Sequence, residues 1–328
     1  MQTLPTTIAY FGKLPTHGDF VQRNAGGAAL RALDAWLQKG LYVARRQLGA
    51  RFEATYDAMP PFAFRYHTGD GLLVGVIHPS RDRVGRRYPF MVAFEVPEAE
   101  AGPAPVPETP LRYAAFFERA AQLARRAAGG DLEPALLAPA AERFGDLVDG
   151  RDARPALERF YRETPLPTLW EHLWGHADDS RKYILFKNLL DILLPLQRTV
   201  PTGFPLVLRF PLCADAGRRP FVVSFWTDVC LRLVDGPAAG SSACPSLFWT
   251  HPVSQETPNA PHLLLTLRPP RAGSFALLVN PALDDDTLCD LESLGSRNAA
   301  QAALAIPARY GELLEADHLS LATFLDRL

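Results

Sequence analysis

Cysteine is scarce in this chain of 328 residues, and its placement argues against two kinds of site. All four cysteines lie in the second half, and none belongs to a C-x-x-C pair. This spacing is typical neither of a disulfide framework nor of a zinc site. It predicts small buried or half-buried thiols in a protein of a reducing compartment.

Long apolar runs and an excess of charge are also missing. The most apolar stretch, YILFKNLLDILLPL (183–196), is interrupted by polar residues and Pro195, so it predicts a buried amphipathic helix and no membrane span. The first residues lack the basic start and apolar centre of a signal peptide, and a cytoplasmic location is expected. A formal net charge of -2 gives no general attraction to nucleic acid or to an anionic membrane.

Strand-like and helix-like segments occur in groups along the first half. A short strand is predicted at 7–14 and an amphipathic helix at 28–48. Three further strands are predicted at FAFRYH (62–67), GLLVGVIHP (71–79) and YPFMVAFEV (88–96), with TGDG as the hairpin turn between the first two. A proline-rich spacer follows at 97–110, and helices are predicted at 111–128, 132–148 and 153–163.

The second half repeats this grouping. Helices are predicted through residue 196, then strands, then two closing helices at 284–294 and 320–328. The strands are predicted at 205–212, 220–234, 245–250, 261–269 and 273–281. Grouped elements favour an α+β fold with two domains, 1–165 and 166–328, each a mainly antiparallel sheet with helices packed on it.

The stretch YFGKLPTHGDFVQRN (10–24) invites a phosphate-loop interpretation, which its residues do not support. A Walker loop needs Ser or Thr after Gly-Lys to hold magnesium, and Leu14 stands there. Pro15 also blocks the helix that would begin at this point. No cofactor is therefore expected, and no G-x-S-x-G nucleophile motif occurs in the sequence.

Two interpretations of the polar residues remain open. His17, Asp19, His78 and Asp82 could converge as a metal-dependent hydrolytic site. Alternatively, the loop SRDRVGRR (80–87) could bind an acidic partner, because arginine forks suit carboxylates and phosphates. The overall charge argues against nucleic acid as that partner.

Together, the two segments resemble the signature stretches of the type VI secretion-associated TagF/ImpM family. The first segment matches the family pattern at Gly12, Lys13, Leu14, Pro15, Gly18, Asp19, Phe20, Val21 and Arg23. The second matches it at Pro79, Ser80, Asp82, Val84, Gly85, Arg86, Tyr88 and Pro89. Trp36 matches the tryptophan-bearing helix that follows the first motif in the family.

The resemblance implies a cytoplasmic accessory protein without catalytic activity, metal or cofactor. It implies a post-translational repressor of type VI assembly whose partner is a forkhead-associated scaffold protein; a structural part of the secretion machine is the other non-enzymatic possibility. Within the motifs we expect a rigid strand-to-turn element in which Asp19 pairs with Arg86. Arg81, Arg83 and Arg87 are then expected to face solvent and bind the partner.

Overall fold

The structure is a computed structural model of the whole chain. It describes residues 7–68, 71–96, 106–132, 137–138, 144, 152–197, 201, 204–235, 243, 245–251, 260–283, 285–293 and 298–328. The predicted helix at 132–148 and most of the predicted spacer lie outside these residues, as do residues 69 and 70 of the hairpin turn.

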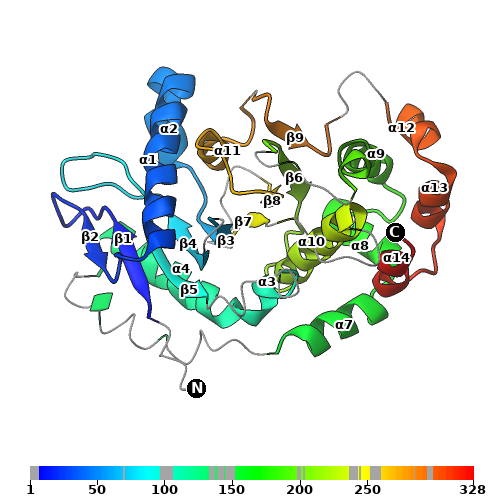
Figure 1. Cartoon of the computed structure of the whole chain (residues 1–328), viewed down its shortest axis with the longest axis horizontal. Helices are drawn as coiled ribbons and strands as arrows, with labels where there is room; N and C mark the ends of the chain where they lie inside the picture. Colours follow the sequence, from blue (N-terminus) through cyan, green and yellow to red (C-terminus); the bar gives the residue numbers. More distant parts are fainter. Residues whose placement is uncertain are drawn as a thin grey trace.

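The first half contributes five strands, of which four were predicted, and the short strand β2 and the short helix α2 were not predicted (Figure 1). The elements are β1 (Ala9–Gly12), β2 (Val21–Arg23), α1 (Ala28–Leu48), α2 (Phe52–Asp57), β3 (Phe62–His67), β4 (Leu72–His78), β5 (Phe90–Val96), α3 (Thr109–Arg112) and α4 (Ala114–Gly129). A 3-10 turn at Gly49–Arg51 joins α1 to α2. The predicted helix at 28–48 and the hairpin formed by β3 and β4 are confirmed.

The second half is richer in helix. Its elements are α7 (Arg154–Glu163), α8 (Leu166–Trp174), α9 (Arg181–Leu193), β6 (Val207–Pro211), α10 (Arg219–Asp235), β7 (Ser246–Thr250), β8 (His262–Thr266), α11 (Ser274–Val279), β9 (Leu288–Asp290), α12 (Ala299–Ala305), α13 (Ala308–Glu315) and α14 (Leu321–Arg327). A 3-10 turn at Leu194–Leu196 ends α9, and α14 confirms the predicted closing helix.

The strands of both halves form one sheet. In the described part of the chain it has nine strands in the order β2-β1-β5-β4-β3-β7-β8-β6-β9. The halves join where β3 pairs antiparallel with β7, with Ala63 opposite Trp249. Among the described strands β6 and β9 run parallel, and the other pairs are antiparallel. The α+β class is confirmed, the two expected sheets are continuous, and a domain boundary after residue 165 stays a prediction.

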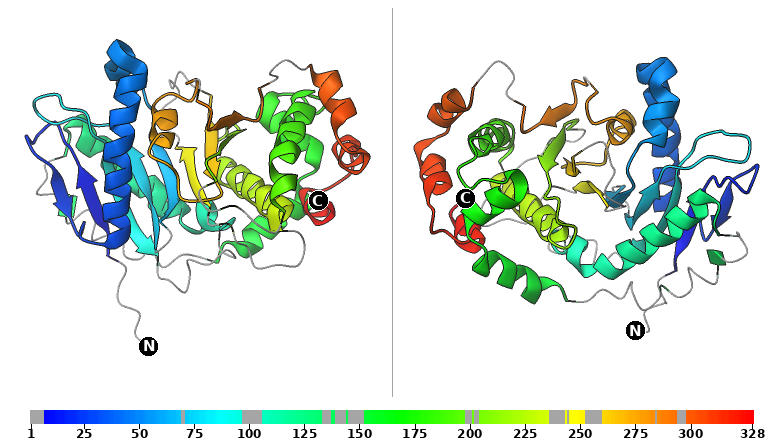
Figure 2. Two further views of the ribbon diagram at one scale, coloured as in Figure 1. Left: turned by 45° about the horizontal axis from the view of Figure 1, so that its top comes forward. Right: turned by 180° about the vertical axis from the view of Figure 1, so that it is seen from behind.

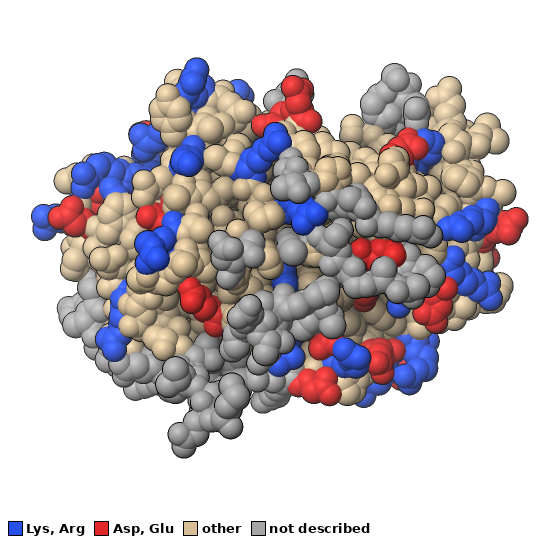
Figure 3. All heavy atoms as spheres, viewed as in Figure 1, with Lys and Arg blue, Asp and Glu red and all other residues tan. Residues whose placement is uncertain are grey.

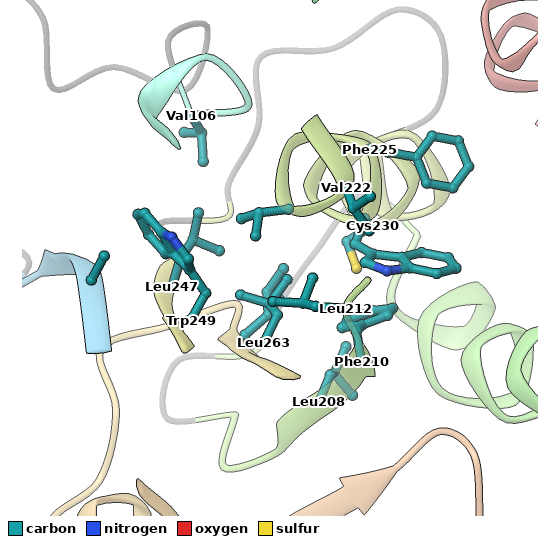
Figure 4. Close-up of a cluster of buried hydrophobic side chains, with 14 of the residues drawn as sticks. Val106, Leu208, Phe210, Leu212, Val222, Phe225, Cys230, Leu247, Trp249 and Leu263 are labelled. Carbon is teal, nitrogen blue, oxygen red and sulfur yellow. The ribbon is translucent and has the colours of Figure 1, made fainter. Parts of the chain in front are cut away.

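Helices cover both faces of this sheet (Figure 2). One face packs on α1, α2 and α11, and the other packs on α4, α9 and α10. Each face forms one hydrophobic cluster with its helices. Within β3, Phe62 and Phe64 belong to the first cluster, on the face of α1, whereas Ala63 belongs to the second cluster, on the face of α10. Because both faces are buried, the central strands β3, β4 and β5 are mostly apolar and show no regular alternation with polar residues. Figure 4 shows side chains of β6, β7 and β8 converging with those of α10 in the second cluster.

Three predictions in the second half were wrong. The segment predicted as a strand at 220–234 is α10, which is buried on almost every side and so lacks the apolar stripe that marks a surface helix. Its polar Ser224 and Thr227 donate to the carbonyls four residues earlier, at 2.9 and 2.7 Å. The strand predicted at 273–281 is the fully buried α11, for the same reason.

The third error is the helix predicted at 284–294. Asp285 does not begin a helix there: its carboxylate accepts from the backbone of Thr287 at 2.8 Å and forms a turn. The chain then enters β9, which pairs with β6, and Asp290 forms an ion pair with Arg209 at 3.0 Å. Asp285 therefore stabilises the turn, and Asp290 stabilises the edge of the sheet.

Candidate functional site

The sheet brings the two motif segments to one end of the molecule. β1 pairs antiparallel with β5, with Phe11 opposite Met91, so the segment that follows β1 lies beside the segment that precedes β5. Gly12 ends β1 with a φ of 143°. A Cβ atom at this position would lie 2.2 Å from the carbonyl oxygen of Pro89. Only glycine allows the two segments to approach this closely.

Asp82 is the centre of the contacts between the segments. Its side chain is fully buried, and Oδ2 accepts from Lys13 Nζ at 2.7 Å and from Arg86 Nε at 2.6 Å. Oδ1 accepts from the backbone amides of Val84 and Arg86 at 3.1 and 2.8 Å. Gly85, with a φ of 90°, makes the turn that folds Arg86 back onto the carboxylate. One carboxylate therefore holds both segments.

The electrostatics of this cluster keep Asp82 ionised. Burial alone would raise its pKa, but hydrogen bonds from Lys13 and from the backbone and side chain of Arg86 outweigh burial and hold the pKa well below the usual range of aspartate. Two cations face this anion, so its charge is compensated within the protein. A carboxylate in this state is a poor proton acceptor and is suited to holding structure.

Backbone contacts complete the junction. Ser80 Oγ donates to the carbonyl of Lys13 at 2.6 Å, which makes Ser80 a link between the segments and not a nucleophile. The amide of Arg83 donates to the carbonyl of His17 at 2.8 Å, and Arg86 Nη2 donates to the carbonyl of Gly18 at 2.5 Å. We call the two segments 13–20 and 79–89, held together in this way, the motif junction.

Residues 9–143 match the family model of the TagF N-terminal domain, which is described as type VI secretion system-associated. The crystal structure of PA0076 from Pseudomonas aeruginosa PAO1 is similar at 18% sequence identity and a TM-score of 0.46, with 85% of this chain and 96% of that chain covered. No curated protein matches the chain. The match covers the segment that carries both motifs, in agreement with the resemblance to the TagF/ImpM family.

The motif junction contains an ion pair that the sequence did not predict. The expected Asp19–Arg86 pair was wrong: Arg86 binds Asp82, whereas Asp19 is exposed and makes no ion pair within the described residues. Lys13 takes the role of second cation. No signal in the sequence could have paired Lys13 with Asp82, because 69 positions separate them and only the β1–β5 pairing brings them together.

The three arginines expected to face solvent divide into two groups. Arg81 and Arg83 are exposed and make no side-chain ion pair within the part of the chain that the structure describes. Arg87 is different: its side chain is 12% exposed and forks onto Asp57 at 2.9 and 2.7 Å, with Glu53 at 2.9 Å. Arg87 therefore fixes α2 to the junction, and its expected exposure was wrong.

The two aromatic residues of the family motifs, Phe20 and Trp36, lie in different places. Phe20 stacks on Phe11 with ring centroids 5.0 Å apart and meets Tyr88 edge-on at 4.9 Å, yet it stays 42% exposed. Trp36 lies in the core instead, stacked on Phe248 and donating to the carbonyl of Arg271 at 2.7 Å. Trp36 thus joins α1 to the second half of the chain and does not contribute to the surface.

The four residues of the hydrolase alternative do not converge. His17 and Asp19 are exposed, Asp82 is buried in its ion pairs, and half-buried His78 bonds to the carbonyl of Pro79 at 2.8 Å. Burial lowers the pKa of His78. Among the described residues, no group of three metal-ligating side chains forms a site. Nor does any described helix have the length and apolar character to cross a membrane.

Cations predominate over this end of the molecule. Figure 3 shows Lys and Arg side chains gathered over the left part of the face, where α1, α2 and the motif junction lie. Val84 is 69% exposed between the arginines of the loop, and Phe20 lies on the neighbouring segment. The junction thus combines a closed, ion-paired interior with a basic exterior that includes two exposed apolar side chains.

Proposed function

We propose that the protein is a non-enzymatic accessory protein of a bacterial type VI secretion system that represses assembly after translation. It acts in the cytoplasm by binding a forkhead-associated scaffold protein of the apparatus. One observation carries this proposal: the buried carboxylate of Asp82 is compensated by Lys13 and Arg86, while Arg81 and Arg83 remain exposed and unpaired within the described residues.

The exposed side chains suit a protein partner. A guanidinium forks onto a carboxylate through two parallel hydrogen bonds, so Arg81 and Arg83 favour an acidic surface. Phe20 and Val84 supply apolar area beside them, and aromatic residues with arginine are enriched in protein interfaces. The rigid junction keeps these side chains in place, which lowers the entropy that binding would otherwise cost.

The proposal is tested in cells that carry the secretion system. Deletion of the gene should raise secretion activity, and the wild-type chain supplied in trans should repress it again. The double variant Arg81→Ala, Arg83→Ala should be produced at the same level and fail to repress. Full repression by this variant would contradict a role for the junction surface.

A matched control shows whether the effect is specific to the arginines of the motif junction or follows from the loss of any two positive charges. Arg119 and Arg126 are exposed on α4, and replacing both with alanine changes net charge equally. This control should repress as the wild type does. Capture from a native lysate distinguishes a repressor from a structural component, because a repressor should bind transiently and a component should stay with the assembled apparatus.

A further inference from the structure

A pocket of about 420 Å³ lies between α4 and the start of α10. α4 supplies Phe117, Glu118 and Arg125, the start of α10 supplies Arg219, and Trp249 comes from β7. α4 belongs to the TagF segment, whereas α10 and β7 lie beyond it. The pocket is therefore shared by the two halves of the chain, and its volume is in the range of small-molecule sites.

The pocket has an aromatic floor. Phe117 and Trp249 meet edge-on with centroids 4.9 Å apart, and the two side chains are otherwise buried in the core. Figure 4 shows Trp249 beside Leu247 in the apolar cluster of the core. Such a surface suits a flat ring or an aliphatic group, which would gain by leaving water.

Arg219 gives the pocket a buried positive charge. The residue is 6% exposed, and its guanidinium donates to the carbonyls of Cys213, Thr250 and Ala214 at 3.2, 3.1 and 3.1 Å. A guanidinium has five N–H groups, so these three bonds leave donors for a ligand. No carboxylate forms an ion pair with Arg219 within the described residues, and a buried cation without an anion is costly.

The rim of the pocket adds a second cation. Arg125 is exposed on α4 and makes no ion pair within the part of the chain that the structure describes. Glu118, two turns earlier on the same face, accepts a hydrogen bond from Gln122 at 3.4 Å. Among the described lining residues, which also include His251, two arginines against one glutamate leave an excess of one formal positive charge, which matches a singly charged anion.

We propose that this pocket binds a monocarboxylate with an aromatic or aliphatic body. The carboxylate takes the remaining N–H groups of Arg219 and is approached by Arg125 from the rim, while the body rests on Phe117 and Trp249. The same chemistry is presented by a free organic acid and by the C-terminal residue of a peptide, and the two sources are separated by experiment.

The test is isothermal titration calorimetry of the full chain with 3-phenylpropionate and with its neutral amide. The carboxylate should bind saturably with a dissociation constant of about 1 mM or tighter, as expected for a ligand of this size. The amide should bind at least about tenfold more weakly, because it lacks the charged hydrogen bonds. Equal binding of both probes, or no binding of either, would overturn the proposal.

Substitutions in the pocket test whether the carboxylate binds there, and a second variant is available if the first does not fold. Arg125→Gln should weaken binding of the carboxylate, whereas Arg119→Gln, on the same helix but outside the pocket, should not. Arg219→Lys keeps the charge and loses the fork; if it does not fold, Ala114→Phe at the exposed rim fills the pocket without touching the core. Undiminished binding to folded Ala114→Phe would place the ligand elsewhere and refute the proposal.

A third probe distinguishes a peptide C-terminus from a free organic acid as the ligand. N-acetyl-glycyl-phenylalanine carries the same phenyl and carboxylate groups on a peptide, and its C-terminal amide is the control. Binding at least about tenfold tighter than 3-phenylpropionate would identify a peptide C-terminus as the ligand, since the added backbone would then contribute. Equal or weaker binding would identify a free organic acid.

Discussion

Asp82→Ala removes the anion on which the motif junction depends. Lys13, with a side chain 10% exposed, would lose its carboxylate, and breaking a buried pair in this way costs about 3–5 kcal/mol. Arg86 is 57% exposed, so its share of the ion pair adds less than about 1 kcal/mol. We expect a loss of about 4 kcal/mol in the free energy of unfolding, a large part of the stability of a typical domain.

Urea unfolding of the full chain, followed by circular dichroism and tryptophan fluorescence, measures this loss. Asp19→Ala is the matched control, because Asp19 is an exposed acid of the same motif, and it should change stability by no more than about 0.5 kcal/mol. Adding Lys13→Met to Asp82→Ala should recover at least about 1 kcal/mol by removing the unpaired cation. A loss below about 1 kcal/mol for Asp82→Ala, or a larger one for Asp19→Ala, would refute the ion-paired junction.

Three further substitutions probe other parts of the structure. Gly12→Ala should be poorly tolerated, with a loss of more than about 2 kcal/mol, because of the carbonyl of Pro89 and the positive φ; normal melting would contradict the close approach. Arg87→Ala should cost about 1 kcal/mol in urea unfolding by releasing α2, and no loss would contradict that link. Burial is the main cause that raises the pKa of Asp228 to about 6, so wild-type stability should fall as pH rises from about 4 to about 6. Asp228→Asn should therefore melt higher than the wild type at pH 7, with the difference shrinking toward pH 4, and a constant difference would rule this explanation out.

The sequence predicted β1, β3, β4 and β5 because these segments are short, apolar and bounded by turn residues, whereas the polar strand β2 was not predicted. It failed at α10 because a helix buried on almost every side carries no clear amphipathic period, and its valines and aromatic residues resemble those of a strand. The single continuous sheet was also beyond prediction, since the pairing of β3 with β7 joins segments about half the chain apart.

The motif residues could be located from the sequence, whereas their contacts could not. Pro15 and Gly18 indicated a rigid turn, and the amide of His17 donates to the carbonyl of Leu14 at 3.0 Å in a turn at this position. The choice of Asp82 over Asp19 as the buried acid depends on a strand pairing that no local pattern encodes. The exposure of Arg83 and the burial of Arg87 likewise depend on where α2 lies.

The most direct measurement of the proposed function is calorimetric binding of the purified chain to the purified forkhead-associated scaffold of the same secretion system, at low and at high salt. The wild type should bind, more weakly at high salt, and folded Arg81→Ala, Arg83→Ala should bind at least about tenfold more weakly with less dependence on salt. The control Arg119→Ala, Arg126→Ala should bind as the wild type does. No binding by the wild type, or equal binding by the double variant at both salt concentrations, would contradict the proposal that the motif junction recognises this partner.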